Sequence, residues 1–364
     1  MTEEFGTVYD LMVLHEIDMR TAAYVHALNR IGGRLMFWDG TKSWRYLGST
    51  LVILGFVLVL AAVLPWWPLR LAASITGGLV LVRAFIIYHD YMHGSLLRGS
   101  RPARVVLYSL GLLMLTPPRH WRFAHNFHHA HVGKVVIPKE DAFPVLTSDI
   151  GSFPLMSTER WQRATTWQRL RYRITRHPLT ILCAYLTIFL LVSCINPLAK
   201  NPRKYWDGAF SLLAHGGLIA LLWRFAGFDV AMFSVALPFA IAAALGAYLF
   251  YAQHTYEGLR ILPTEEWTYF QGALESSSYM KLGPIMKWFT GNIGYHHVHH
   301  LNPHIPFYRL PEAMAAIPEL QHPVVTSLRP RDILSCFRAN LWDSPSQRMV
   351  SYRDATISTE QRSC

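Results

Sequence analysis

Four long apolar stretches constrain this chain more than any other feature of its sequence. They cover residues 46–67, 69–89, 208–227 and 230–254. A helix needs about 20 apolar residues to cross the hydrocarbon core of a bilayer, and each stretch reaches that length. Lipid offers no hydrogen-bond partners to the backbone, so unbroken apolar runs of this kind predict helices. The sequence therefore predicts an all-α integral membrane protein with four transmembrane helices.

Two further apolar runs, 105–116 and 179–195, are shorter. The first is too short to span, and the second is marginal. Histidine-rich segments follow the second span and the last one, and they share one side of the membrane only if 179–195 does not cross it. Basic residues lie on both flanks of this run, within 160–176 and 200–204, as on loops that stay in the cytosol. We expect both runs to be short membrane-dipping or interfacial helices.

The charge of the chain also fits a membrane protein. It has 34 Lys and Arg against 23 Asp and Glu, a formal net charge of +11, yet 52% of its residues are hydrophobic. The sequence lacks the basic helix or aromatic-bearing strand of a nucleic-acid-binding domain. An excess of Lys and Arg in cytosolic loops explains the charge, so we expect a lipid bilayer as partner and no nucleic acid.

We expect one domain over residues 1–364, with a polar tail at 341–364 that is loosely ordered over its last stretch, 344–364. Its cytosolic parts are 89–207 and 254–340. The bilayer would be a bacterial inner membrane, or the endoplasmic reticulum if the source is eukaryotic.

Three histidine clusters lie at the span ends and in the loops. They contribute His89 and His93 from "HDYMH", His125, His128 and His129 from "HNFHH", and His296, His299 and His300 from "HHVHH". On a helix, residues three and four apart share a face, so each cluster can aim its imidazoles in one direction, as a metal site requires. By the same geometry, His131 and His297 should point elsewhere.

A ninth histidine, His254, lies at the end of the last apolar run and on the same side of the membrane. Imidazole binds iron, copper, zinc and nickel, so the ligand type alone does not choose the metal. A catalytic zinc ion uses about three protein ligands, whereas nine histidines suffice for two ions. Two neighbouring redox metals would suit the activation of dioxygen.

Two other classes of protein remain open on these residues. A membrane zinc hydrolase would use about three of the ligands and need no electron donor. A haem-binding electron carrier would place histidine pairs inside the spans on facing helices, whereas these histidines crowd span ends and loops. Metal content would distinguish the three classes.

The three clusters resemble the histidine boxes of the integral-membrane fatty acid desaturase family, which includes hydroxylases. They have the form H-x-x-x-H, H-x-x-H-H and H-x-x-H-H, and the resemblance runs from "HDYMHGSL" to "IGYHHVHHLNPHIPFYRLPEA". The segments "YAQHTYEG" and "NPHIPFYRL" are most similar to those of the acyl-lipid omega-6, or delta-12, branch. The resemblance implies four spans, a cytosolic histidine-rich cap and two iron ions.

The resemblance also implies roles and partners. All nine residues would be iron ligands: His89, His93, His125, His128, His129, His254, His296, His299 and His300. The reaction would be the oxygen-dependent removal of two hydrogens from a fatty acyl chain, giving a double bond and water. The alternative is a hydroxylase or another di-iron oxygenase acting on a lipid or hydrocarbon chain. The substrate would be a fatty acyl lipid or an acyl thioester.

Some members of this family carry a fused cytochrome domain as their electron donor, and a sequence motif identifies that domain. The His-Pro-Gly-Gly sequence of a fused haem-binding cytochrome domain does not occur in the chain. We therefore expect electrons from an external ferredoxin or small cytochrome with its reductase.

Four polar residues near the histidines in sequence could hydrogen-bond to the imidazoles and fix their tautomers. They are Asp90, Asp141, Glu257 and Asn292. A helix cap or a plain surface charge is the alternative role, and we favour it for Asp141 and Glu257.

Overall fold

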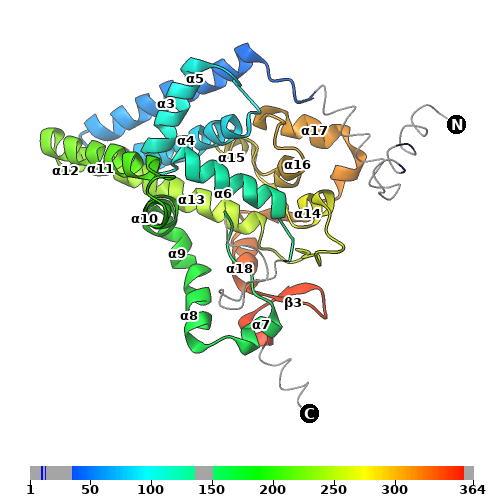
Figure 1. Ribbon diagram of the computed structural model, residues 1–364. Coiled ribbons are helices and arrows are strands. Elements are labelled where there is room, and N and C mark those ends of the chain that lie inside the picture. Colours follow the sequence, from blue (N-terminus) through cyan, green and yellow to red (C-terminus); the bar gives the residue numbers. More distant parts are fainter. Residues whose placement is uncertain (1–9, 11–12, 14–34, 136–150, 356–364) are drawn as a thin grey trace.

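The computed structural model describes residues 35–135 and 151–355, together with Asp10 and Val13. Within these residues, four helical segments are long and apolar enough to cross a membrane, which confirms the predicted all-α fold with four spans. They are α3 (Gly40–Val63), α4 (Trp67–His93), α11 (Asp207–Ala226) and the run Phe228–Gln253. The last consists of α12 (Phe228–Ala231), a π-helical turn η2 (Met232–Ala236) and α13 (Leu237–Gln253). In Figure 1, α12 and α13 lie along one line, and α11 runs beside α12, against which it packs.

The most buried of the four spans is α4, which packs against both α3 and α13. Close approach to α13 requires a residue without a side chain, because a Cβ at Gly78 would lie 2.8 Å from the Pro238 carbonyl oxygen. Small residues commonly allow such contacts between membrane helices. On α3, one stripe of residues at alternating spacings of three and four is buried: Ser43, Leu47, Thr50, Leu54, Val57 and Ala61. The exposed residues on its other faces suit contact with lipid.

The end of α4 positions the first two histidines. The helix starts with Pro68 in its first turn, where a missing N–H costs nothing, and it ends at Gly94. Gly94 adopts φ 74°, a left-handed conformation that favours glycine at the end of a helix. His89 and His93 therefore lie one above the other on the last turns of the span.

The first of the two shorter apolar runs forms α5 (Arg101–Leu113). Three carbonyls at its end accept hydrogen bonds from side chains of neighbouring segments, which a helix ending among apolar surroundings needs. The donors are Ser211 Oγ to Leu112, His215 Nδ1 to Leu113 and Cys194 Sγ to Leu115.

The second run forms α9 (Pro178–Leu182), the π-helix η1 (Tyr185–Ile195) and α10 (Asn196–Lys200). Its apolar helical part, Tyr185–Lys200, is shorter than any of the four candidate spans. Tyr185 and Phe189 pack edge-on against Phe239 at the start of α13. The short length agrees with the expectation that this run does not add a fifth span.

Short helices build the cap beside the histidine-bearing ends of the spans (Figure 1). They are α6 (Pro118–His131), α7 (Thr158–Arg163), α8 (Thr166–Thr175), α14 (Tyr269–Glu275), α15 (Pro284–Phe289), α16 (His296–Leu301), η3 (Phe307–Arg309), α17 (Leu310–Ala316), η4 (Pro318–Gln321) and α18 (Pro330–Arg338). Among the described residues there are also two small sheets. One pairs β1 (Tyr279–Lys281) in parallel with β2 (Val325–Ser327), and the other pairs β3 (Leu341–Asp343) antiparallel to β4 (Arg348–Val350).

The stretch predicted to be loosely ordered, 344–364, is ordered over its described part, which contains β4 and the buried Ala355, so that prediction is wrong for 344–355. Just before it, Leu341 belongs to a small buried core that includes Trp161 and Tyr172, and Trp342 is buried in the main core. The Trp342 N–H donates to the Met156 carbonyl at 3.1 Å. The few apolar residues of this polar stretch are enough to order it, because β3 and β4 pair as a hairpin that covers α7. Residues 356–364 lie outside the described part.

Candidate metal centre

Four segments of the chain bring the nine histidines to one place. The first pair comes from the end of α4, the second cluster from α6, the third from α16, and His254 follows α13 directly. All but His93 and His254 are buried, and those two are half-buried. The sequence prediction that the clusters meet on one side of the spans agrees with this arrangement.

Helix geometry selects which imidazoles enter the centre. On α6, His125, His128 and His129 are all buried on one face, whereas His131 turns away and its Nδ1 donates to the Phe127 carbonyl at 2.9 Å. On α16, His297 is buried but belongs to neither histidine group described below. Both residues point elsewhere, as their spacing predicts.

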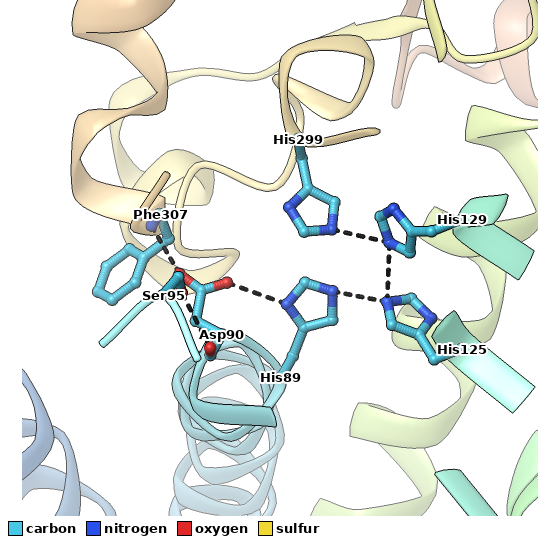
Figure 2. Close-up of polar contacts among 7 residues, drawn as sticks. All are labelled: His89, Asp90, Ser95, His125, His129, His299 and Phe307. Carbon is cyan, nitrogen blue, oxygen red and sulfur yellow. Dashed lines mark hydrogen bonds and ion pairs between the residues drawn. The ribbon is translucent and has the colours of Figure 1, made fainter. Parts of the chain in front are cut away.

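Five of the histidines form one group, and Figure 2 shows all of them except His93. They are His89, His93, His125, His129 and His299, and their candidate ligand nitrogens all lie within 4.8 Å of one another. The Nε2 atom of His125 is 3.0 Å from that of His89 and 3.2 Å from that of His129. The Nε2 atom of His299 is 3.2 Å from that of His129. This is the convergence that a metal ion needs.

The other four histidines form a second group. His128, His254 and His300 have ligand nitrogens within 4.8 Å of one another. His296 joins them, because its Nε2 lies 2.9 Å from that of His254 and 3.2 Å from that of His300. The two groups adjoin, since the rings of His129 and His300 stack with centroids 4.1 Å apart.

In two of the imidazoles, the hydrogen bond at Nδ1 leaves the Nε2 nitrogen free to bind a cation. His89 Nδ1 faces the Asp90 carboxylate at 3.0 Å, and His254 Nδ1 faces the Ser276 carbonyl at 2.9 Å, so both Nδ1 atoms donate. In a neutral imidazole the other nitrogen then carries a lone pair. The two Nε2 lone pairs point into the groups, where further imidazole nitrogens crowd them at about 3 Å. His93 Nε2 is also buried without a hydrogen-bond partner. The residues present are therefore compatible with metal ions held by imidazole nitrogens.

Burial keeps these imidazoles neutral. Desolvation lowers the pKa of His125, His129 and His299 well below its ordinary range, and neighbouring imidazoles lower it further. Burial lowers the pKa of His254 to about 4, although its hydrogen bond to the Ser276 carbonyl opposes the shift. A neutral imidazole is the form that binds a metal, so the centre is prepared for ligation at neutral pH.

This shift predicts how the metal-free protein responds to acid. The ordinary pKa of 6.5 applies to His254 in the unfolded chain, whereas the fold holds it neutral down to about pH 4. Between these values the unfolded state binds more protons, so the free energy of unfolding falls as the pH falls through this window. Thermal unfolding midpoints of the metal-free protein across the window measure the effect, and His254→Gln should show a smaller decline. A midpoint that stays constant from pH 6.5 to pH 4 would count against neutral buried imidazoles.

Asp90 links the first histidine to the rest of the cap (Figure 2). One carboxylate oxygen accepts from His89, and the other accepts the Phe307 N–H at 2.6 Å. Asn292 acts one step further away, since its side-chain amide donates to the Phe307 carbonyl at 3.2 Å. Among the remaining candidates for this role, Glu257 is exposed and Asp141 lies outside the described residues.

We expect Asp90→Asn to lower metal affinity by about 10–100-fold, the usual cost of losing a carboxylate that orients a histidine ligand. An amide cannot accept from both His89 and the Phe307 N–H without turning its NH₂ towards one of these donors. Titration of the metal-free protein against a competing chelator measures the change. The matched control is Asp229→Asn, because the Asp229 side chain is 73% exposed at the far end of the spans. Equal affinities for the two variants would show that Asp90 does not support the centre.

Sequence reasoning missed a buried arginine behind the second group. Arg176 Nη2 donates to Tyr251 Oη at 3.2 Å and to Thr255 Oγ1 at 3.3 Å, on either side of His254. The same guanidinium donates to the carbonyls of Pro154 and Ala339. These partners are 22 to 163 residues away in the sequence, so no local pattern signals the role. Ser276, which fixes the His254 tautomer, was missed for the same reason.

Four spans with nine clustered histidines at one end define an integral membrane protein with a histidine-rich, metal-compatible centre. The family model for fatty acid desaturases matches residues 65–331, which include all nine histidines. The chain belongs to the fatty acid desaturase family, whose members are oxidoreductases.

Several curated relatives support this assignment. A fatty acid desaturase of Bacillus subtilis is 30% identical over 286 residues, which cover 78% of this chain and 78% of that protein. The chloroplastic omega-6 fatty acid desaturase of Brassica napus is 24% identical, over 77% of this chain and 61% of that protein. An sn-1 acyl-lipid omega-3 desaturase (ferredoxin) of Synechocystis sp. is 25% identical, over 73% of this chain and 72% of that protein.

Proposed function

We propose that this protein desaturates a fatty acyl chain in an oxygen-dependent reaction at two iron ions held by the nine histidines. The observation that carries the proposal is the division of nine imidazoles, seven buried and two half-buried, into adjoining groups of five and four. One ion cannot use so many ligands, whereas two ions with four or five each would use all of them.

The balance of the reaction favours a redox metal over zinc. Removing two hydrogens from a CH₂–CH₂ unit yields two electrons and two protons, while reduction of O₂ to two waters consumes four of each. Two more electrons and two protons must therefore come from outside, which requires a separate donor. When bound, the iron ions would supply the oxidising power that no amino-acid side chain has. Zinc has no redox chemistry.

Residues of the chain would orient the ligands and exclude water. Asp90 and the Ser276 carbonyl fix the tautomers of His89 and His254. Trp121 stacks on the His125 ring with centroids 4.5 Å apart, and Phe250 packs against His128 at 5.0 Å. Such an apolar surround limits the access of water to a metal site.

The substrate, the electron donor and the side of the membrane on which the histidines lie can be proposed as well. We propose one desaturase domain over the whole chain, acting on a fatty acyl lipid or acyl thioester, with a ferredoxin or small cytochrome and its reductase as electron donor. A relative in Synechocystis sp. carries ferredoxin in its name, which supports this type of donor. The omega-6 branch is a proposal too, supported by the match to the Brassica napus relative. The basic residues of 160–176 and 200–204 support placing the histidine side in the cytosol.

Expression in a host with a working donor system, followed by gas chromatography and mass spectrometry of the fatty acids, tests the proposal. A new double bond that disappears in His125→Ala but persists in His131→Ala is the expected result. A new hydroxyl group with the same dependence would move the activity to hydroxylation. No new product, with iron and reduced donor demonstrably present, would contradict acyl-chain oxidation.

A further inference from the structure

One face of helix α8 (Thr166–Thr175) is apolar and exposed. Trp167, Leu170 and Ile174 follow one another at spacings of three and four, so they share a face. Their exposed fractions are 69%, 46% and 53%. Tyr172, on the opposite face, is fully buried and holds the helix against the cap. Three large apolar side chains on one helix face are more than scattered surface hydrophobics.

This face continues into apolar surface that leads to the spans. Beyond α8, Leu179 and Leu182 of α9 and Leu186 of η1 are also mostly exposed. The segment η1 then packs against α11 and α13, two of the candidate spans. In Figure 1, α8 runs downward from α9, across the direction of α11 and α13. A helix that crosses the direction of the spans runs parallel to the bilayer plane, and here its exposed face is apolar.

The charge around α8 has one sign. Between Glu159 and Asp207 the chain has no acidic residue and nine Lys or Arg. Arg171 and Arg173 are exposed and adjoin the apolar face in the helix. Long basic side chains can keep their stems on apolar surface while the guanidinium reaches the aqueous layer.

We propose that α8 is an in-plane lipid anchor. Its apolar face lies at the boundary between headgroups and acyl chains, in the leaflet on the histidine side, and its arginines bind the phosphates of anionic phospholipids. An amphipathic helix with Trp and Leu on one face and arginines beside them has the composition of interfacial helices. Continuity with the apolar surface of η1 favours lipid over a protein partner on this face.

The anchor has a consequence for the histidine centre. Arg176 follows α8 directly, and its guanidinium contacts Tyr251 and Thr255, which lie on either side of His254 in the sequence. Lipid contact along α8 therefore fixes the level of His254 relative to the bilayer surface. The proposal itself depends on the membrane spans and not on the reaction at the histidines.

Spin labels on the full-length protein in vesicles test the anchor. Single cysteines replace Leu170 or Trp167 on the proposed lipid face, and Ser344 on the exposed β3–β4 hairpin as control. The exposed Cys183 and the terminal Cys364 are first changed to serine, while Cys194 and Cys336 are buried and remain. Accessibility to O₂, which concentrates in lipid, is compared with accessibility to a water-soluble nickel complex.

We expect labels at 170 and 167 to be open to O₂ and shielded from nickel, with the reverse at 344. The contrast should grow when phosphatidylglycerol is added to phosphatidylcholine vesicles, and Arg171→Gln should reduce that gain. Two positions on the face guard against one variant failing to fold, and unfolding midpoints identify such a variant. Labels at 167 and 170 as open to nickel as the label at 344 would overturn the proposal, and the face would then suit a protein partner such as an acidic electron donor.

Discussion

Replacing His129 with alanine should remove most of the bound metal and lower the desaturation rate by at least about 100-fold, since even residues that only orient a ligand cost 10–100-fold. His129 contacts imidazoles of both groups. Its Nε2 lies 3.2 Å from those of His125 and His299, and its ring stacks on His300 in the other group. Loss of this side chain therefore removes one ligand nitrogen from the first group, and it also removes the ring that lies between the first group and the second. Metal content of the purified variant and product formation per chain measure both effects.

The matched control is His131→Ala, two residues further along the same helix. His131 donates to the Phe127 carbonyl within α6 and contributes no nitrogen to either group. We expect this variant to keep its metal and its activity. If both variants lost activity equally, the effect would belong to α6 as a helix and not to a ligand. If neither did, His129 would not be a ligand.

Metal replacement is expected to separate stability from activity. Removal of the metal by a chelator should abolish activity and lower the unfolding midpoint, because a ligand present at about 1,000 times its dissociation constant stabilises a fold by about 4 kcal/mol. Zinc also binds imidazole nitrogens, so it should restore much of the lost unfolding midpoint. It should restore no desaturation, because zinc has no redox chemistry. Ferrous iron should restore both.

The readouts are the unfolding midpoint and the double bonds formed per chain, with each metal added to the same metal-free preparation. Activity with zinc would contradict the oxidative reaction and favour a hydrolase. Failure of either metal to raise the midpoint would indicate that the histidine groups do not bind metal in the folded protein.

The sequence predicted the spans well and their limits less well. The first apolar stretch, 46–67, corresponds to α3 at Gly40–Val63. The helix starts earlier because the Asp39 side chain caps it, accepting from the Lys42 N–H, although the residues there are polar. It ends at Val63 because Pro65 follows, and the residue before a proline avoids helical geometry. Hydropathy reports lipid contact, whereas caps and prolines set where a helix begins and ends.

The site was predictable to the level of single helices. Spacings of three and four correctly assigned faces to His125, His128 and His129 and excluded His131. The division into five and four was not predictable, because it depends on how α4, α6 and α16 approach one another. His128 and His129 are neighbours in sequence yet belong to different groups. Partners such as the Ser276 carbonyl come from the backbone of distant segments, so residue type gives no signal for them.

The metal content of the purified protein tests most directly whether the nine histidines hold two iron ions. Inductively coupled plasma mass spectrometry on protein quantified by amino-acid analysis gives each metal per chain. We expect two irons per chain and little zinc, with the iron falling to one or none in His129→Ala. One iron per chain at full activity, or zinc in place of iron, would show that the nine histidines do not hold two iron ions.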